Sequence, residues 1–378
     1  MLRGVPDAPV AETADALVLE GPRALVRRRF AVPEVGDDDA VLRVEACGLC
    51  GTDHELYTGA LAPGFAFVPG HEAVGTIEAI GVRAAERWQV RAGDRVAVEC
   101  FQSCRRCERC RSDDYRHCER HGLGDMYGLV DAARQPSLWG GFATHQYLAP
   151  DSMLLRVPDE LDSVLAVAFN PVGAGIRWGV TVPRTQPGEV VAILGCGIRG
   201  LAAAAAAKEA GAGFILVTGA GPRDRERLEL APAFGADLAV DVREDDPVAL
   251  LRRHVGVGAD VVVDVTSNAP EAFGQAVALA GTGARVVVAG TRGAGSGAPG
   301  FEPDVIVYKE LELRGALGVD AAAYRAAIDL LVGGRYPFAE LPRRVVGLDG
   351  ASALLETMAG ERGAPPVHAV LAPESSRP

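Results

Sequence analysis

The sequence predicts an α/β protein in which a β-rich N-terminal domain is followed by a domain built on a doubly wound parallel sheet. A length of 378 residues suits two domains at about 150 residues each. The first 150 residues or so contain short apolar alternations, at residues 40–45, 73–80 and 94–99, that glycine and proline interrupt. From about Gly188 an apolar strand, a glycine turn and a helix follow one another repeatedly. Fully apolar strands that alternate with helices are typical of a parallel sheet covered on both faces.

The second half of the chain supplies the predicted strands and helices of that sheet. The expected strands are residues 190–194, 214–218, 238–242, 260–265, 284–289 and 311–317. The expected helices are residues 198–210, 224–234, 247–255 and 270–279, with two more at 322–332 and 351–358 in the C-terminal tail. Residues 304–310 lead into the last strand.

Composition excludes several classes of partner. With 38 basic and 50 acidic residues the net charge is −12, which argues against nucleic acid or an anionic membrane as a partner. The N-terminus lacks the basic and apolar regions of a signal peptide. The most apolar stretch, residues 190–207, carries Arg199 and three glycines, so it falls short of the ~20 apolar residues that a membrane span needs. We therefore predict a cytoplasmic protein.

A glycine motif directly after an apolar strand predicts a dinucleotide site. Gly195, Gly197 and Gly200 form G-x-G-x-x-G at the start of an alanine-rich helix. In such a motif the first glycine allows the tight turn, the second lets the backbone approach a pyrophosphate, and the third lets helix and strand pack closely. The alternative is a tight βα turn that binds nothing. We also assign Ile198, Thr266 and Gly290 to this cofactor site.

The end of the next strand bears on the choice between NADP and NAD. About 20 residues after the motif an acid normally binds the adenosine ribose, but Gly219 stands at that place. Arg223 and Arg225 follow at once, and guanidinium groups suit a 2′-phosphate. These residues favour NADP. The alternative is that both arginines belong to a solvated helix start and that Asp224 binds the ribose of NAD.

Four closely spaced cysteines predict a structural zinc site. Cys104, Cys107, Cys110 and Cys118 lie within fifteen residues, in a lobe at about residues 100–120. A closed tetrahedral site needs four soft ligands, and short x-x spacings bend a loop around one ion. Disulfide pairs are the alternative, which the predicted compartment disfavours. Cys100 is expected to pack as a small buried thiol.

Two further segments complete a set of motifs that resembles a known family. They are Cys50-Gly51-Thr52-Asp53 and Gly70-His71-Glu72. Together with the cysteine lobe, the glycine turn and Tyr308-Lys309-Glu310-Leu311, they resemble the zinc-dependent medium-chain alcohol/polyol dehydrogenases in order along the chain. The resemblance implies a GroES-like catalytic domain at residues 1–174, a Rossmann domain at 175–320 and a C-terminal segment at 321–378 that returns to the catalytic domain. It also implies a homodimer or homotetramer and two zinc ions per chain.

The resemblance also implies the roles of individual residues. Cys50 and His71 resemble the family's catalytic zinc ligands, and Glu72 resembles the adjacent carboxylate that can also ligate the ion. Asp53 resembles the acid that holds the imidazole of the histidine ligand, and Thr52 resembles the hydroxyl that passes on the substrate's proton.

Two positions depart from the family's pattern. Asn170 stands where the family has a third Cys or Glu ligand, and a neutral amide is a poorer zinc ligand, so Asn170 either reaches the ion weakly or contacts substrate. Glu55 stands where many members have a histidine, which is similar to sugar-oxidising members and suggests a polyhydroxylated substrate.

The predicted function is hydride transfer between NADP or NAD and a small secondary alcohol or polyol, cyclic polyols included, with the carbonyl as the substrate in reverse. One alternative keeps the fold but loses the metal step, which would give a zinc-free reductase or a non-redox enzyme. The other is a zinc-ribbon interaction protein whose Rossmann domain senses the redox state of the nicotinamide pool.

Overall fold

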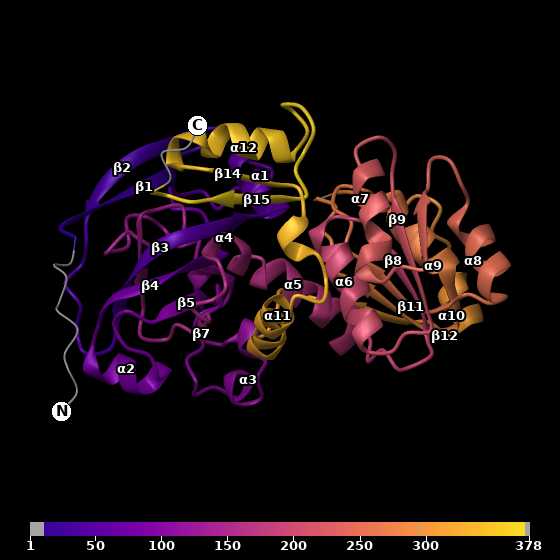
Figure 1. Ribbon diagram of the computed structural model, residues 1–378, viewed down its shortest axis with the longest axis horizontal. Coiled ribbons are helices and arrows are strands. Elements are labelled where there is room, and N and C mark those ends of the chain that lie inside the picture. The colour runs from indigo at the N-terminus through magenta and orange to yellow at the C-terminus, as the bar shows by residue number, and fades with distance from the viewer. Residues whose placement is uncertain (1–10, 294, 375–378) are drawn as a thin grey trace. The chain divides into compact units, whose positions relative to one another are not determined.

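A computed structural model describes residues 11–293 and 295–374, and the contacts among them define two units (Figure 1). Unit 1 contains residues 11–167, 344–359 and 369–374. Unit 2 contains the described residues of 168–343 and residues 360–368. The contacts thus divide the chain after Val167 and Arg343, whereas the sequence placed the divisions after residues 174 and 320.

Unit 2 holds a parallel sheet of six strands in the order β10-β9-β8-β11-β12-β13. The strands are β8 Val190–Leu194, β9 Phe214–Gly219, β10 Leu238–Asp241, β11 Ala259–Asp264, β12 Ala280–Val288 and β13 Glu312–Gly315. This order reverses direction beside β8, and doubly wound sheets bind dinucleotides at such a point. The predicted fold class of this half is therefore confirmed.

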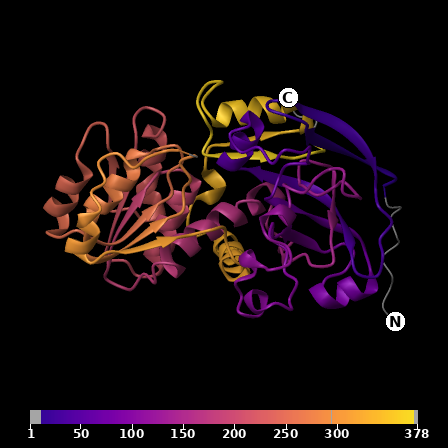
Figure 2. The same cartoon turned by 180° about the vertical axis from the view of Figure 1, so that it is seen from behind.

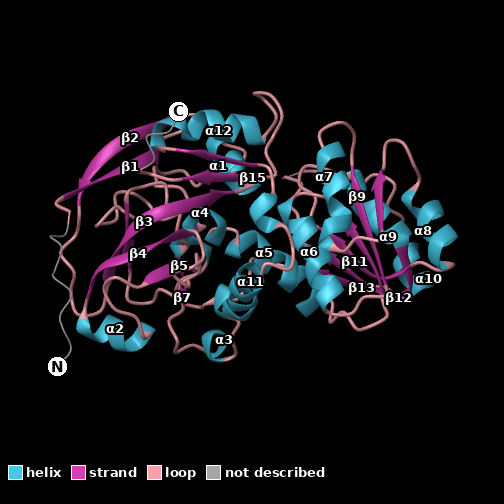
Figure 3. Ribbon diagram, viewed as in Figure 1, coloured by secondary structure: helices cyan, strands magenta, loops and turns pink. Residues whose placement is uncertain are grey.

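Helices cover both faces of the unit 2 sheet (Figure 3). They are α6 Ile198–Glu209, α7 Arg225–Leu230, α8 Pro247–Val255, α9 Glu271–Leu279 and α10 Asp304–Lys309. Helix α5 Phe169–Ile176 and a π-helical turn Arg177–Thr181 pack against α6, and α11 Ala321–Gly333 packs against α5. One face of the sheet packs its buried valines, leucines and alanines against α8 and α9. Burying this apolar surface provides the main driving force for folding the unit.

Unit 1 is β-rich, as the alternating pattern predicted. Its main sheet has the order β14-β15-β3-β4-β5-β7, with β6 paired to β3, and β1 and β2 form a separate antiparallel pair (Figure 2). The strands are β1 Thr13–Leu19, β2 Leu25–Ala31, β3 Ala40–Leu49, β4 Ala73–Ile80, β5 Arg95–Val98, β6 His145–Leu148, β7 Leu154–Arg156, β14 Arg343–Val346 and β15 His368–Leu371. The helices of unit 1 are α1 Gly51–Thr58, α2 Val82–Trp88, α3 Glu108–Arg111, α4 Ser163–Ala166 and α12 Ala351–Met358, and its 3₁₀ turns are Tyr115–His117, Leu123–Asp125 and Leu348–Gly350. The 3₁₀ turns Ala231–Phe234 and Phe338–Glu340 belong to unit 2.

The C-terminal segment completes unit 1. Strand β15 pairs with β3 in antiparallel register, with Ala369 opposite Leu49 and Leu371 opposite Cys47. Helix α12 packs on α1, where the Tyr57 hydroxyl donates to Glu356 at 3.3 Å. Residues 351–358 and 369–371 therefore support the helix and the strand on either side of Cys50. Among the described residues no helix is long and apolar enough to span a membrane.

Candidate active site and metal centres

Cys50 ends the β3 segment and caps helix α1. Its Sγ accepts the backbone N–H of Thr52 at 3.3 Å, and its own N–H donates to Asp53 Oδ2 at 2.9 Å, which makes a reciprocal capping box. The cap fixes the position of the thiol at the start of the helix. Thr52 is half-buried in the first turn.

His71 meets Cys50 from the segment before β4. The Nε2 atom of His71 lies 3.3 Å from Cys50 Sγ, while Nδ1 lies 3.5 Å from Asp53 Oδ1, a buried oxygen that has no hydrogen-bond partner within the described part of the chain. Burial disfavours the charged imidazole, but the negative charges of Asp53 and Cys50 outweigh this effect and raise the pKa of His71 well above its usual range. The pocket is therefore one that attracts positive charge.

Glu72 lies on the other side of the imidazole. Its Oε1 is 4.0 Å from His71 Nε2, and its side chain is almost completely buried. Gly48 makes room for it, since a Cβ there would lie 2.3 Å from Glu72 Oε2. The side chains close enough to share one ion are Cys50, His71 and Asp53, whose ligand atoms lie within 4.8 Å of one another, and Glu72 lies beside this group. A thiolate, an imidazole and nearby carboxylates suit Zn²⁺, and ~3.6 Å between S and N is expected for two tetrahedral ligands at ~2.3 and ~2.05 Å. The sequence did not indicate this role of Gly48.

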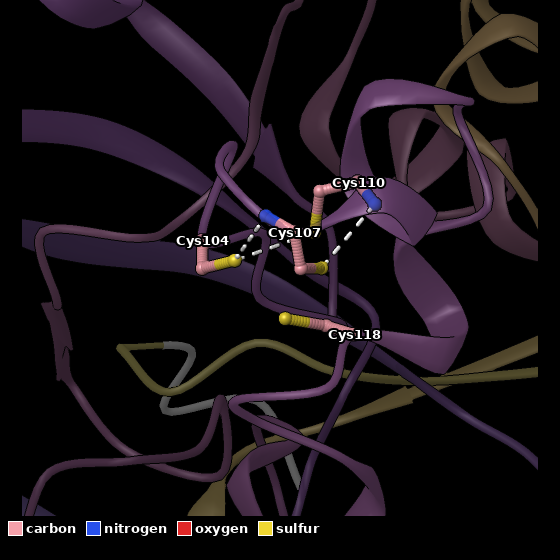
Figure 4. A group of neighbouring side chains, drawn as sticks. All are labelled: Cys104, Cys107, Cys110 and Cys118. Carbon is pink, nitrogen blue, oxygen red and sulfur yellow. Dashed lines mark hydrogen bonds between the residues drawn. The ribbon is translucent and has the colours of Figure 1, made fainter.

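The four lobe cysteines converge as the spacing predicted (Figure 4). Their sulfur atoms all lie within 4.8 Å of one another, and all eight cysteines of the chain are free thiols. Cys104 Sγ lies 3.8 Å from Cys110 Sγ, the separation that tetrahedral geometry gives for ~2.3 Å Zn–S bonds. Backbone N–H groups of Cys107 and Cys110 donate to the preceding thiols, and the N–H of Cys107 lowers the pKa of Cys104 to about 6. The disulfide alternative is wrong, and the arrangement fits a closed zinc site.

In unit 2 each glycine of the motif has a distinct environment. Gly195 has φ +102°, a conformation that glycine adopts at little cost. A Cβ on Gly200 would lie 1.8 Å from Gly195 O, so helix and turn touch backbone to backbone. A Cβ on Gly197 would meet nothing within 4 Å, so the space in front of this residue is open. This is the geometry that a bound pyrophosphate requires.

The strand ends around this turn carry an ion pair that the sequence reading missed. Asp264, fully buried at the end of β11, accepts the N–H and hydroxyl of Thr266 at 3.0 and 2.6 Å and pairs with Arg292. Arg292 also donates to Gly290 O at 3.1 Å. The pair thus fixes both Thr266 and Gly290, two residues assigned to the cofactor site. The signal in the sequence was an acid directly after the three valines of residues 261–263.

Gly219 is a glycine because two side chains fill the space beside it. A Cβ there would lie 2.7 Å from Cys196 Sγ and 2.9 Å from Asp224 Cβ. The carboxylate of Asp224 accepts from Ala220 N at 2.9 Å and from Arg227 Nη1 at 3.0 Å. Both of its oxygens therefore already hold the loop in place.

The arginines near this loop differ in their contacts. Arg223 donates to Gly360 O at 3.2 Å, whereas Arg225 is exposed. Arg243, which follows β10, packs its guanidinium against Gly221, where a Cβ would lie 3.0 Å from Arg243 Nη1. Arg243 was not predicted, because only the fold brings the end of β10 beside the loop after β9.

Asn170 lies in the first turn of α5, in unit 2, and is 6% exposed. Its Nδ2 donates to Tyr324 Oη at 2.9 Å, and its Oδ1 lies 3.5 Å from Arg199 Nη2. Its predicted role at the metal stays a prediction.

Comparison with known proteins decides the family. The model of the alcohol dehydrogenase GroES-like domain matches residues 36–159, and that of the zinc-binding dehydrogenases matches residues 200–333. A protein of Mycobacterium tuberculosis named probable alcohol dehydrogenase is 70% identical over 95% of this chain and 98% of its own length. The chain belongs to the zinc-dependent medium-chain alcohol dehydrogenase family. The predicted resemblance and both predicted domain types are therefore confirmed.

More distant members of the medium-chain family agree. Sorbitol dehydrogenase of Bacillus subtilis is 32% identical over 74% of this chain and 76% of its own length. A zinc-binding dehydrogenase from Sinorhizobium meliloti 1021, solved with NADP bound, superposes with a TM-score of 0.82 at 28% identity and covers 96% of this chain and 100% of its own. The chain is thus a medium-chain, NAD(P)-dependent zinc dehydrogenase, and the alternative of a non-enzymatic interaction protein is wrong.

Proposed function

We propose that this chain transfers hydride between NADP(H) and a secondary alcohol or polyol, cyclic polyols included, at a zinc site held by Cys50, His71 and Glu72. The approach of Cys50 Sγ to His71 Nε2, at 3.3 Å and backed by the buried Asp53, carries the proposal. When bound there, zinc supplies a Lewis acid that lowers the pKa of the substrate's hydroxyl. A second zinc in the cysteine lobe would stabilise the fold.

The protein's own residues orient the substrate and move the proton. Asp53 fixes the imidazole of His71 through Nδ1, which directs Nε2 toward the thiol. Thr52 stands two residues after Cys50, in the first turn of α1, where its hydroxyl can take the proton that the substrate loses. The glycine turn holds the pyrophosphate, which places the nicotinamide for the hydride.

The loop after β9 supports NADP as the preferred cofactor. The position of the ribose acid is Gly219, and the carboxylate of Asp224 is engaged by Ala220 and Arg227. Arg225 and Arg243 are then the guanidinium groups that can bind a 2′-phosphate. That the Sinorhizobium meliloti relative was solved with NADP agrees with this choice.

The edge of the unit 2 sheet supports a homodimer. Among the described residues β13 is the last strand of its sheet and pairs only with β12, and Leu313 on it is 41% exposed. Val307 and Tyr308 on α10 are 72% and 80% exposed. An open strand edge beside exposed apolar side chains is a surface that a second copy can cover. We also propose a cytoplasmic location, where the zinc-binding thiols stay reduced.

A substrate screen with metal analysis tests the proposed function. Purified protein is assayed with a panel of secondary alcohols and linear and cyclic polyols, each with NADP and NAD, and its zinc content is measured. We expect turnover with two zinc ions per chain. His71→Gln should lose one zinc and all turnover, while His54→Gln, which changes the neighbouring histidine on α1, should keep both. Turnover that survives His71→Gln would contradict the proposal.

A further inference from the structure

Asn170 and Arg199 meet because glycines let two helices of unit 2 pack closely. A Cβ on Gly175 of α5 would lie 2.5 Å from the backbone of Ala202 on α6, so the helix backbones touch there. This contact joins the last turn of α5 to α6, and the Asn170–Arg199 contact brings the first turns of the two helices together. Asn170 Oδ1 faces Arg199 Nη2 at 3.5 Å, and the Arg199 guanidinium also lies 5.9 Å from the centre of the Trp178 ring.

The chemistry of the neighbours fixes the orientation of the Asn170 amide. A guanidinium can only donate hydrogen bonds, so the amide must turn its oxygen toward Arg199. The amide nitrogen then donates to Tyr324 Oη at 2.9 Å. Tyr324 is itself buried, with its ring 4.9 Å from that of Phe169, so it cannot turn away without loss of packing. Both ends of the amide are thus engaged within unit 2.

Arg199 stands at an end of α6 that disfavours a cation. It is the second residue of the helix, where the backbone N–H groups give a partial positive charge. This first turn has no acidic residue, and its N-cap Gly197 has no side chain to bind the N–H groups. A nearby anion stabilises a positive side chain at an uncapped helix start, and a bound pyrophosphate supplies such an anion. The open space at Gly197 lies at this same turn.

We propose that Asn170 positions Arg199, and that Arg199 binds the pyrophosphate of the cofactor from the first turn of α6. Residue 170 then serves the dinucleotide and is not a ligand of the catalytic zinc. The inference rests on the proposed function, whose zinc ligands remain Cys50, His71 and Glu72.

This pairing explains why residue 170 is neutral. A carboxylate at this buried position would pair with the Arg199 guanidinium, and the pair would remove the positive charge that the pyrophosphate needs. An amide orients the guanidinium through its dipole and adds no negative charge beside it. The substitution of Asn for the family's anionic ligand is therefore matched to Arg199.

Cofactor binding and zinc loss in the same variants test the pair. The variants are Asn170→Ala, Arg199→Met, the double variant and Arg199→Lys, and Lys208→Met at the other end of α6 is the control. Dissociation constants for NADPH and NADH come from nicotinamide fluorescence, and zinc loss to a chelator is followed in the same samples.

Arg199→Met should weaken NADPH and NADH equally, by roughly tenfold or more, because both cofactors share the pyrophosphate. Asn170→Ala should weaken both by a smaller factor and add nothing to Arg199→Met. Arg199→Lys should recover part of the loss. Zinc loss from Asn170→Ala should match wild type, and Lys208→Met should change neither readout.

Two results would overturn the inference. One is faster zinc loss from Asn170→Ala with unchanged cofactor affinity, which would make residue 170 a metal ligand. The other is unchanged affinity for both cofactors in Arg199→Met, a variant that tests the pair even if Asn170→Ala is unstable. Failure of the proposed function would show in the wild-type protein, which would then lack the catalytic zinc or turn over no alcohol. That result does not depend on how tightly the variants bind the cofactor.

Discussion

Alanine substitutions at two glycines of the same motif should separate cofactor binding from folding. Gly197 and Gly200 lie three residues apart, yet an added methyl group meets different surroundings at each. At Gly197 it enters open space, and φ is −67°, which alanine adopts freely. At Gly200 it would lie 1.8 Å from the carbonyl oxygen of Gly195, far inside van der Waals contact.

The expected magnitudes follow from this geometry. In Gly197→Ala the unfolded chain becomes less flexible, which stabilises the folded protein by about 0.4–1 kcal/mol. Alanine is a poorer N-cap residue than glycine, which destabilises it by a similar amount. The free energy of unfolding should therefore hardly change. In Gly200→Ala the turn and helix must separate, which costs about 1–3 kcal/mol or more. For cofactor affinity the order reverses, because the Gly197 methyl group occupies the path of the pyrophosphate. A steric cost of about 1–3 kcal/mol weakens binding roughly fivefold to a hundredfold.

Urea unfolding and titration with NADPH measure the two effects on one preparation. The expected pattern is a wild-type unfolding midpoint with weakened binding for Gly197→Ala, and a lowered midpoint for Gly200→Ala. Wild-type affinity in a folded Gly197→Ala protein would refute the assignment of this turn to the pyrophosphate.

Four further outcomes are expected. Cys107→Ser should lose one of two zinc ions and lower the melting temperature, whereas Cys100→Ser should keep both ions; equal zinc content in the two variants would contradict the lobe site. Burial raises the pKa of Glu99 to about 7 from 4.5, so the native state binds more protons between these pH values, and stability should fall by about 3 kcal/mol as pH rises from 4.5 to 7. Glu99→Gln should flatten that fall in urea unfolding at several pH values, and an unchanged slope would rule out this carboxyl. Arg243→Met should lower kcat/KM for NADP tenfold to a hundredfold and leave NAD unchanged; equal losses would show that Arg243 does not bind the 2′-phosphate. Leu313→Glu should convert a dimer to a monomer in light scattering, and a dimer that persists would show that β13 lies outside the interface.

Local patterns in the sequence were sufficient for the parallel sheet and the zinc lobe. Strand β8 and helices α8 and α12 have the predicted bounds, because apolar runs between glycine turns leave little freedom in assignment. The lobe follows from spacing alone, since four thiols within fifteen residues can reach one ion. The predicted strand at residues 311–317 is shorter in the structure, Glu312–Gly315, because at the sheet edge only the residues opposite β12 form a ladder.

Features that depend on contacts between distant residues could not be read from the sequence. Asn170 and Tyr324 are 154 residues apart, and no local pattern relates them. No local pattern relates Arg243 to Gly221 either, or predicts that β15 pairs with β3. Strand β2 was not predicted because its arginines leave it exposed on most positions, so it lacks the apolar signal of a buried strand.

The two units select ligands of opposite charge within one acidic chain. In unit 1 a thiol, Asp53 and Glu72 surround His71, and this negative pocket attracts a cation. In unit 2 the first turn of α6 lacks an acid and carries Arg199, and Arg243 stands by the loop after β9, so this surface attracts an anion. Interactions between exposed charges are screened beyond about 8–10 Å at ordinary ionic strength, so the net charge of −12 hardly weakens either local field. The arrangement of a few side chains, and not the net charge, therefore decides that a polyanionic cofactor can bind to an acidic chain.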